Sequence, residues 1–302
     1  MQLQSPSGLS IDISALLRLR HLCTARAHAS HLRVGAMPGP ITTRRQGRGS
    51  EIDDVRPWHF GDDLRHIDRN STARTGMPHA KTFREEREQT IVLAADFRRP
   101  MLFGTRRALM SVAAAEILSL YGWLSVEGGA RVGLFAFGDG EPVYVKPASG
   151  NRGMMAVIGG LARAHPRLDG RGQEGCAQLD ACLNLAAGLL PHNATLVLAS
   201  SLDAPGRFLD DALHGLLHRG RINVALIDDA FSRQAPKGRY PFVTMRGLSG
   251  VRIWADKSSV ESKNGNDASW LRGLGIGVAT FLASTEPCDQ LDPVRRFHDG
   301  RW

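Results

Sequence analysis

Oxygen-bearing side chains occur directly after apolar runs at three places in the sequence. The residues concerned are Asp96; Ser200, Ser201 and Asp203; and Asp228 and Asp229. A run without polar alternation, such as Ile91–Ala95, is typical of a central parallel strand that is buried on both faces. Ligands gather at the carboxyl ends of such strands, so we expect these oxygen atoms to share one rim. Oxygen ligands from three loops suit a hard divalent cation such as Mg²⁺.

A second group of carboxylates lies in and after the charged stretch "GDDLRHIDRNSTAR". The acidic residues are Asp62, Asp63, Asp68, Glu85 and Glu86. A metal-dependent phosphoesterase or nuclease would need such carboxylates. Arginines lie within a few residues of the acids in the stretch, namely Arg65, Arg69 and Arg74. We therefore favour a structural role, in which the acids cap turns or pair with these arginines.

The elements that must position these groups follow an alternating pattern after residue 89. Strands are predicted at 90–96, 129–137, 141–147, 194–200 and 222–228, with helices at 105–126, 151–164, 178–190 and 208–218. After residue 241 the pattern is less regular, with strand-like segments at 251–256 and 277–284. Right-handed crossovers then give an α/β fold with a doubly wound, mostly parallel sheet of the Rossmann type.

Two further segments precede this domain. Residues 1–36 contain an amphipathic helix over 11–32, and we expect it to dock on its own domain rather than on a membrane or nucleic acid. Residues 37–88 form a charged module with interleaved acids and bases, which favours a folded, ion-paired structure over disorder. The remaining domain then covers 89–302.

Composition sets broad limits on function. The 302 residues carry a net charge of +8 and a pI near 9.8, which fits either acidic partners or an Arg-rich surface. Four scattered cysteines favour reduced thiols over a zinc site. With neither a signal peptide nor an apolar run long enough to span a membrane in the sequence, we expect a cytoplasmic protein.

The charged module resembles a known family. The matching residues are Gly61, Asp62, Asp63, Arg65, Ile67, Asp68, Ala73, Arg74 and Glu86. Together with the strand that ends in Asp96, they are similar to the bacterial domain-of-unknown-function family 58 (DUF58), although Arg69 stands where the family usually has Trp. The resemblance covers about residues 47–140. It implies a von Willebrand factor A-like domain, a non-enzymatic adaptor role, and partners among MoxR-type AAA+ ATPases and other von Willebrand factor A-like proteins.

The same resemblance implies a metal-ion-dependent adhesion site with an Asp-x-Ser-x-Ser loop. This chain instead reads Asp96-Phe97-Arg98-Arg99-Pro100, and neither arginine nor proline offers a cation a side-chain ligand. The threonine expected near "GQEGCAQLD" is not evident, and Ser200-Ser201 replaces Ser-Asp, with Asp203 two residues on. We predict a degenerate site without cofactor, a residual Mg²⁺ at Asp96 being the alternative.

A guanidinium is the predicted substitute for the cation. We hypothesise that Arg98 or Arg99 pairs with Asp96; the alternative is that both arginines point into water. The predicted interaction rim thus comprises Asp96, Arg98, Arg99, Ser200, Ser201 and Asp203.

Three other functions compete with the adaptor. They are the phosphoesterase or nuclease described above, nucleic-acid binding through the basic N-terminal region, and a hydrolase triad of Ser200, Asp203 and His214. Nucleic-acid binding lacks an aromatic stacking platform or helix-turn-helix pattern, and the triad lacks the glycines of a nucleophile elbow. We therefore predict a protein that is not an enzyme.

Overall fold

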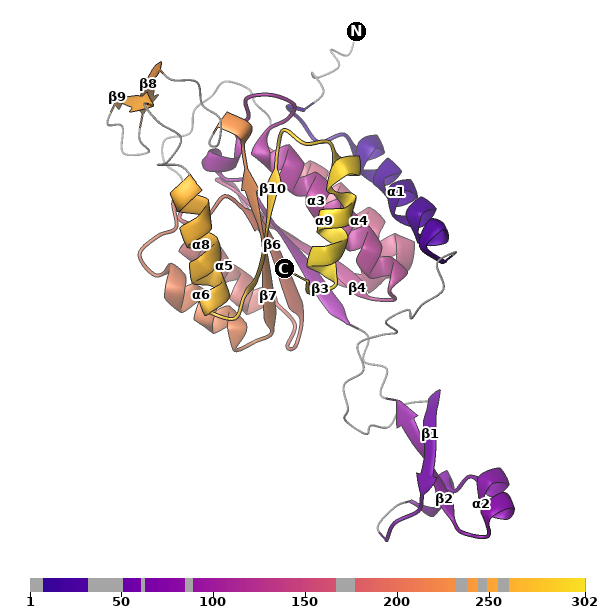
Figure 1. Cartoon of the computed structure of the whole chain (residues 1–302). Helices are drawn as coiled ribbons and strands as arrows, with labels where there is room; N and C mark the ends of the chain where they lie inside the picture. Colours follow the sequence, from indigo (N-terminus) through magenta and orange to yellow (C-terminus); the bar gives the residue numbers. More distant parts are fainter. Residues whose placement is uncertain are drawn as a thin grey trace. The chain divides into compact units, whose positions relative to one another are not determined.

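The chain folds into two compact units, which are described separately. The computed structural model describes residues 8–31, 51–60, 63–84, 89–166, 177–231, 238–243, 249–254 and 261–301. One unit comprises Met1–Arg33 and Gln89–Trp302, and the other comprises Val34–Glu88 (Figure 1).

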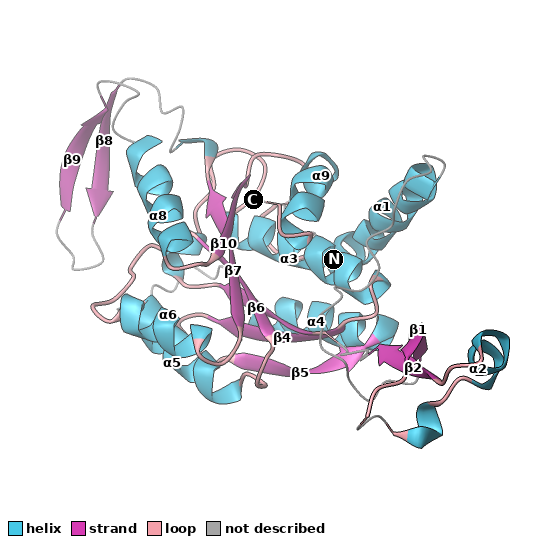
Figure 2. Cartoon of the chain, turned by 60° about the horizontal axis from the view of Figure 1, so that its bottom comes forward, coloured by secondary structure: helices cyan, strands magenta, loops and turns pink. Residues whose placement is uncertain are grey.

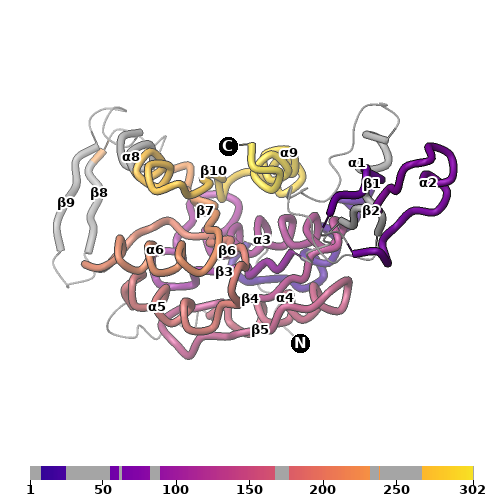
Figure 3. The backbone as a smooth tube through the Cα atoms, turned by 90° about the horizontal axis from the view of Figure 1, so that it is seen from below, coloured from indigo at the N-terminus to yellow at the C-terminus, as the bar shows by residue number. Residues whose placement is uncertain are grey.

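A six-stranded sheet forms the centre of the larger unit. Its strands are β3 (Thr90–Asp96), β4 (Arg131–Phe137), β5 (Val143–Ser149), β6 (Thr195–Ser200), β7 (Arg221–Asp228) and β10 (Gly277–Leu282). They lie in the order β10-β7-β6-β3-β4-β5 (Figure 3), and all neighbours are parallel except β4 and β5. This confirms the predicted mostly parallel α/β sheet. The antiparallel strand β5 follows β4 after the turn at 138–140.

Helices cover both faces of the sheet (Figure 2). On one face lie α3 (Met110–Glu127), α4 (Gly150–Ala164) and α9 (Pro287–His298); on the other lie α5 (Leu179–Leu189), α6 (Leu209–Leu217) and α8 (Glu261–Gly273). Strand β3 shows why its sequence does not alternate. Ile91, Leu93 and Ala95 pack into one hydrophobic cluster, while Val92 and Ala94 pack into the other. Because both faces of the strand are buried, every position of the run is apolar.

The N-terminal helix α1 (Ile13–His31) packs on α3 and belongs to the same unit as the sheet. Leu16, Leu19 and Cys23 are buried there, and Trp123 Nε1 of α3 donates a hydrogen bond to the Leu16 carbonyl oxygen (3.2 Å). Burial raises the pKa of the Cys23 thiol to about 12. The expectation that this helix docks on its own domain is met, whereas its separation as a segment of its own differs from the observed units.

The smaller unit is built on a pair of antiparallel strands that the sequence pattern did not predict. Its strands are β1 (Glu51–Pro57) and β2 (His79–Arg84), with the short helices η1 (Leu64–His66) and α2 (Arg69–Thr75) between them. Few aliphatic residues and a register shift between Ile52 and Asp54 hide the strand periodicity. Helix α2 ends at Gly76, whose φ of 75° lies in the left-handed region that favours glycine.

The region that follows β7 is more regular than predicted. It contains the two-stranded sheet of β8 (Gly238–Val243) and β9 (Ser249–Trp254), then α8, β10 and α9. The helix predicted from residue 105 begins only at Met110, because the preceding loop approaches itself closely: a Cβ on Gly104 would lie 2.3 Å from the Ala108 carbonyl oxygen. Among the helices of the described residues, none has the length and apolar character needed to cross a membrane.

Candidate interaction site at the carboxyl edge of the sheet

Asp96 ends the central strand β3 and is fully buried. Its neighbours at this edge are the end of β4, whose Phe137 carbonyl oxygen accepts a hydrogen bond from the Phe97 backbone N–H (2.7 Å), and the end of β6. From β6, Ser200 Oγ donates to Asp96 Oδ2 (2.6 Å). A buried carboxylate needs compensation of its charge as well as hydrogen bonds, since leaving it alone costs several kcal/mol.

Arg98 provides that compensation from two residues further along the chain. Its Nε donates to Asp96 Oδ1 (2.9 Å) and its Nη2 to Asp96 Oδ2 (2.7 Å), a bidentate pair with both side chains at 0% exposure. The Arg98 backbone N–H adds a third bond, to Oδ1 (3.0 Å). Such charge-assisted, two-point pairs are among the strongest hydrogen-bonded contacts in proteins.

The remaining donors of the guanidinium are also used. Arg98 Nη1 donates to the carbonyl oxygens of Ala177 and Ala204 (both 3.0 Å), and Nη2 donates to that of Asp203 (2.9 Å). With the two bonds to Asp96, all five guanidinium N–H groups have acceptors. The hypothesised pairing with Asp96 is therefore made by Arg98, whereas the neighbouring Arg99 is exposed.

The loop after β6 supplies two of these carbonyls through an unusual backbone. Leu202 (φ 56°) and Ala204 (φ 49°) both adopt the left-handed region, which is uncommon for residues other than glycine. The Leu202 N–H donates to Ser200 Oγ (3.0 Å), and Ser201 Oγ donates to Asp203 Oδ2 (3.0 Å). The loop is thus held in a shape that directs its carbonyls at Arg98.

The same loop contacts the start of α5. The Leu179 and Asp180 N–H groups at the helix N-terminus donate to the carbonyls of Ala204 and Pro205 (3.0 Å each). The Asp180 carboxylate accepts from the Phe208 N–H (3.0 Å), and it lies so close to Gly206 that a Cβ there would come within 2.1 Å. These backbone acceptors were not identified from the sequence, because any residue type supplies a carbonyl. The left-handed backbone of Leu202 and Ala204 could not be predicted from the sequence either, because neither residue is a glycine.

This arrangement does not suit a divalent cation at Asp96. The carboxylate oxygens already accept four hydrogen bonds, from the Arg98 side chain, the Arg98 backbone and Ser200. A guanidinium has no lone pair to offer a metal, and its own positive charge opposes a second cation nearby. In the described part of the chain, no three His, Cys, Asp or Glu side chains are grouped as metal ligands.

The third predicted rim group is occupied by other contacts. Asp229 is buried, and its carboxylate accepts from the Thr105 hydroxyl, the Thr105 N–H (3.1 Å) and the Phe231 N–H (2.9 Å). Asp228 Oδ1 accepts from the Asp229 N–H (2.9 Å). These bonds fasten the loop after β3 to the end of β7. Residues 172–176, near which the threonine of the adhesion site was expected, lie outside the described residues.

A buried serine–histidine pair lies behind the edge. Ser111 Oγ lies 2.9 Å from His165 Nε2, and the His165 ring meets Phe97 edge to face at 5.2 Å between centroids. Burial lowers the pKa of His165 to about 4, against the opposing effect of a backbone hydrogen bond with Pro166. Because Ser111 is fully buried, this pair supports packing and is closed to a substrate. The triad considered above is not assembled, because Ser200 is bonded to Asp96 and His214 Nδ1 to the Asp210 carbonyl.

In the smaller unit, Asp63 and Asp68 accept hydrogen bonds from nearby backbone N–H groups. Asp63 accepts from the Arg65 N–H (2.9 Å) at the start of η1, and Asp68 accepts from the Ser71 N–H (3.0 Å) at the start of α2. Hydrogen bonds with Ser71 lower the pKa of Asp68. Capping, which we favoured, is therefore observed for both acids.

The predicted ion pairs of this unit need a correction. Among the described residues, Asp68 pairs with Lys81 of β2 (3.6 Å) rather than with the predicted arginines. Arg65 contributes its backbone N–H, and the side chains of Arg65 and Arg74 are exposed. The reason is geometric, since β2 runs back alongside Asp68, whose N–H donates to the His79 carbonyl oxygen (2.8 Å). Gly61, Asp62 and Glu86 lie outside the described residues.

Part of the chain that includes Asp96 and Arg98 matches a known protein family. Residues 54–203 match the model of a family described as "Protein of unknown function DUF58". Over this span the chain is similar to the DUF58 family. In sequence, the matched span runs from the smaller unit through the first strands of the sheet to Asp203, in the loop that accepts hydrogen bonds from Arg98. It begins a few residues after the start of the resemblance at 47–140 and extends well beyond its C-terminal end.

The chain is also similar to mycobacterial proteins whose names carry the word "uncharacterized". Two of them are Mb1516 of Mycobacterium bovis and Rv1480 of Mycobacterium tuberculosis, each 36% identical over 110 residues. The alignments cover 35% of this chain and 30% of either relative, so the chain matches less than a third of their length.

Two solved structures are similar to parts of this chain. One is the conserved hypothetical protein BatB from Bacteroides thetaiotaomicron (TM-score 0.44, 12% identity, 70% of this chain and 98% of that chain). The other is a von Willebrand factor type A protein from Catenulispora acidiphila (TM-score 0.43, 13% identity, 74% of this chain and 44% of that chain).

Proposed function

We propose that the protein is a non-enzymatic interaction or adaptor protein that binds a protein partner at the carboxyl edge of its sheet. In this proposal the edge is a degenerate metal-ion-dependent adhesion site, and the Arg98 guanidinium takes the place of the cation. The observation that carries it is the buried Asp96–Arg98 pair with all guanidinium donors satisfied. An enzyme would more often keep a titratable group accessible in a cleft than neutralise it internally.

Exposed aromatic residues at the same edge support a protein partner. Phe103, in the loop after β3, is 44% exposed, and Phe208, in the loop after β6, is 62% exposed. Phe103 also meets Phe231, which follows β7, edge to face at 6.3 Å between centroids. Aromatic side chains that project from several loops of one edge are characteristic of interaction surfaces, where they supply most of the binding energy.

The class of partner is proposed from the family resemblance. A MoxR-type AAA+ ATPase, with other von Willebrand factor A-like proteins, is the candidate, and the cytoplasm is the proposed location. The adaptor would join the ATPase to a client, which requires binding but no chemistry from this chain.

A metal titration tests the proposed site. Mg²⁺ and Mn²⁺ titrated into the wild-type protein by calorimetry should give no stoichiometric binding tighter than about a millimolar. The double substitution Arg98→Ser with Pro100→Ser recreates the Asp-x-Ser-x-Ser loop at Asp96. The melting temperature of this variant should rise when Mg²⁺ is added. Tight stoichiometric binding to the wild-type chain would contradict the proposed degenerate site.

A binding measurement tests the partner and the edge together. The MoxR-type ATPase of the same organism should bind the immobilised wild-type protein. Replacing Phe103 and Phe208 by Ala should weaken that binding by about tenfold or more. The matched control is Leu189→Ala, because Leu189 is also 44% exposed but ends α5 at the opposite edge of the sheet. Equal effects at both edges would argue against the proposed surface.

A further inference from the structure

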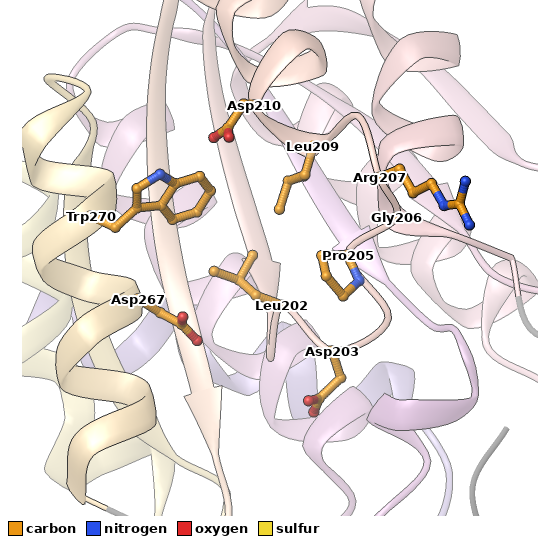
Figure 4. A pocket seen from close by; sticks show the side chains of 9 residues that line it. All are labelled: Leu202, Asp203, Pro205, Gly206, Arg207, Leu209, Asp210, Asp267 and Trp270. Carbon is orange, nitrogen blue, oxygen red and sulfur yellow. The ribbon is translucent and has the colours of Figure 1, made fainter.

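A cavity of about 320 Å³ lies beside the loop that Arg98 holds (Figure 4). The described residues that line it come from this loop, from α6 and from α8: Leu202, Asp203, Pro205, Gly206, Arg207, Leu209, Asp210, Asp267 and Trp270. Its size is at the lower end of the roughly 300–1,000 Å³ of small-molecule pockets, so it suits a single long side chain.

The lining combines an apolar floor with an aromatic wall. Leu202 and Leu209 are buried, at 6% and 8% exposure, and Pro205 completes the apolar part on the loop. Across from them the indole of Trp270 projects from α8 toward the centre of the cavity (Figure 4). This combination favours a ligand group with an aliphatic stem that ends in a flat or compact polar head.

The charged residues around the cavity indicate the charge of the polar head that it binds. Three of the nine lining residues are aspartates and one is arginine. Asp210 and Asp267 lie on either side of the Trp270 ring, while the side chain of Arg207 extends away from the other lining residues (Figure 4). Carboxylates around an indole face attract a cation through both Coulomb and cation–π interactions. This polarity is opposite to the chain's overall positive charge of +8.

The wall formed by the loop is fixed in advance. Asp203 lines the cavity, and its backbone carbonyl accepts from Arg98 Nη2 (2.9 Å). The same guanidinium holds Ala204 (3.0 Å), and Ala204 and Pro205 are tied to the start of α5. A pre-formed wall lowers the entropy that binding would otherwise cost.

We infer that this cavity receives an arginine or lysine side chain of the partner protein. The inference rests on the proposed interaction function, and it specifies that the partner presents a basic side chain to this edge of the sheet. The stem of the basic side chain packs on Leu202 and Leu209, and its head lies between Trp270 and the carboxylates. A guanidinium of the chain thus fills the former cation position, and a cation of the partner enters next to it.

Peptide binding followed by NMR tests the cavity without any partner. The probes are acetyl-Gly-Arg-Gly-amide and acetyl-Gly-Lys-Gly-amide, with acetyl-Gly-Gln-Gly-amide as the neutral control. A basic probe should shift the Trp270 indole N–H resonance, assigned through Trp270→Phe, in a saturable manner, and the Gln probe should not. The double substitution Asp210→Asn with Asp267→Asn should weaken binding about tenfold or more.

Asp211→Asn is the matched control, because Asp211 is exposed on the same helix but does not line the cavity; it should leave binding unchanged. An equal shift with the Gln probe, or no loss in the Asp210/Asp267 variant, would overturn the inference. So would free arginine or agmatine binding at least tenfold tighter than the capped peptide, since that indicates a small-molecule site. If the ATPase binds the Asp210/Asp267 variant as it binds wild type, the inference fails while the proposed function stands; if the peptide binds but no partner does, the proposed function fails.

Discussion

Replacing Arg98 by Met is the most direct perturbation of the buried edge. Methionine keeps much of the length of the side chain but removes its charge and all five donors. Asp96, at 0% exposure, would keep only the bonds from Ser200 Oγ and from the backbone N–H of residue 98. The carbonyls of Ala177, Asp203 and Ala204 would each lose a donor.

The expected loss follows from the cost of leaving one member of a buried ion pair alone, about 3–5 kcal/mol. Urea unfolding at pH 7 gives the free energy of unfolding, and the R98M variant should lose that amount with an unchanged denaturant slope. Arg98→Lys keeps the charge but cannot reach all the acceptors of the fork, so it should fall between wild type and R98M.

Two comparisons make the reasoning refutable. Arg99→Met changes the exposed neighbour and should alter the free energy of unfolding by no more than about 0.5 kcal/mol. In an Asp96→Asn background, R98M should cost about 2 kcal/mol less than in wild type, because the partner charge is already gone. An R98M loss below about 1 kcal/mol, or strict additivity with Asp96→Asn, would show that the pair does not act as described.

Further expectations concern pH and the loop after β6. Because the pKa of His165 is lowered to about 4 from 6.5 in unfolded chain, the unfolded state binds more protons between these values, so stability is fully present above pH 6.5 and is lost as the pH falls toward 4. The loss in the free energy of unfolding should reach about 3 kcal/mol, at about 1.4 kcal/mol per pH unit. Urea titrations at several pH values measure this dependence. His165→Gln should remove it, whereas His192→Gln, at an exposed position, should leave it in place. Gly206→Ala should lower the free energy of unfolding by about 1–3 kcal/mol, since its φ is 86° and the new Cβ would meet Asp180. Gly188→Ala, in open space on α5, should instead raise it by up to about 1 kcal/mol; equal effects of the two glycine changes in the same urea assay would contradict the predicted clash.

The sheet could be predicted from sequence because its strands carry a strong pattern. Each buried strand is a continuous apolar run, and the polar residues at its end mark the edge where Asp96 and Ser200 meet. The antiparallel pair of β1 and β2 could not be found in this way. Its stability depends on pairing between distant residues such as Pro57 and His79, and the sequence shows no apolar alternation there.

The candidate site was predictable only as far as its side chains. Arg98 stood where a hydroxyl ligand was expected, so its pairing with Asp96 could be hypothesised from the chemistry of the guanidinium. The choice between Arg98 and Arg99 required the backbone, because the short helix η2 (Arg99–Met101) turns Arg99 outward. The cavity beside Trp270 was invisible to sequence reasoning, since α8 falls in a region where no helix was predicted.

The position of α1 makes the larger unit discontinuous in sequence. A fragment that begins at Gln89 would contain every strand of the large sheet but would lack the helix that covers α3. The indole N–H of Trp123 would then lose its acceptor on Leu16, and Arg295 would lose the Cys23 carbonyl oxygen to which its Nη2 donates (2.8 Å). Boundaries drawn at the match to residues 54–203 would cut through both the sheet and its covering helices, so the family span alone is not a folding unit.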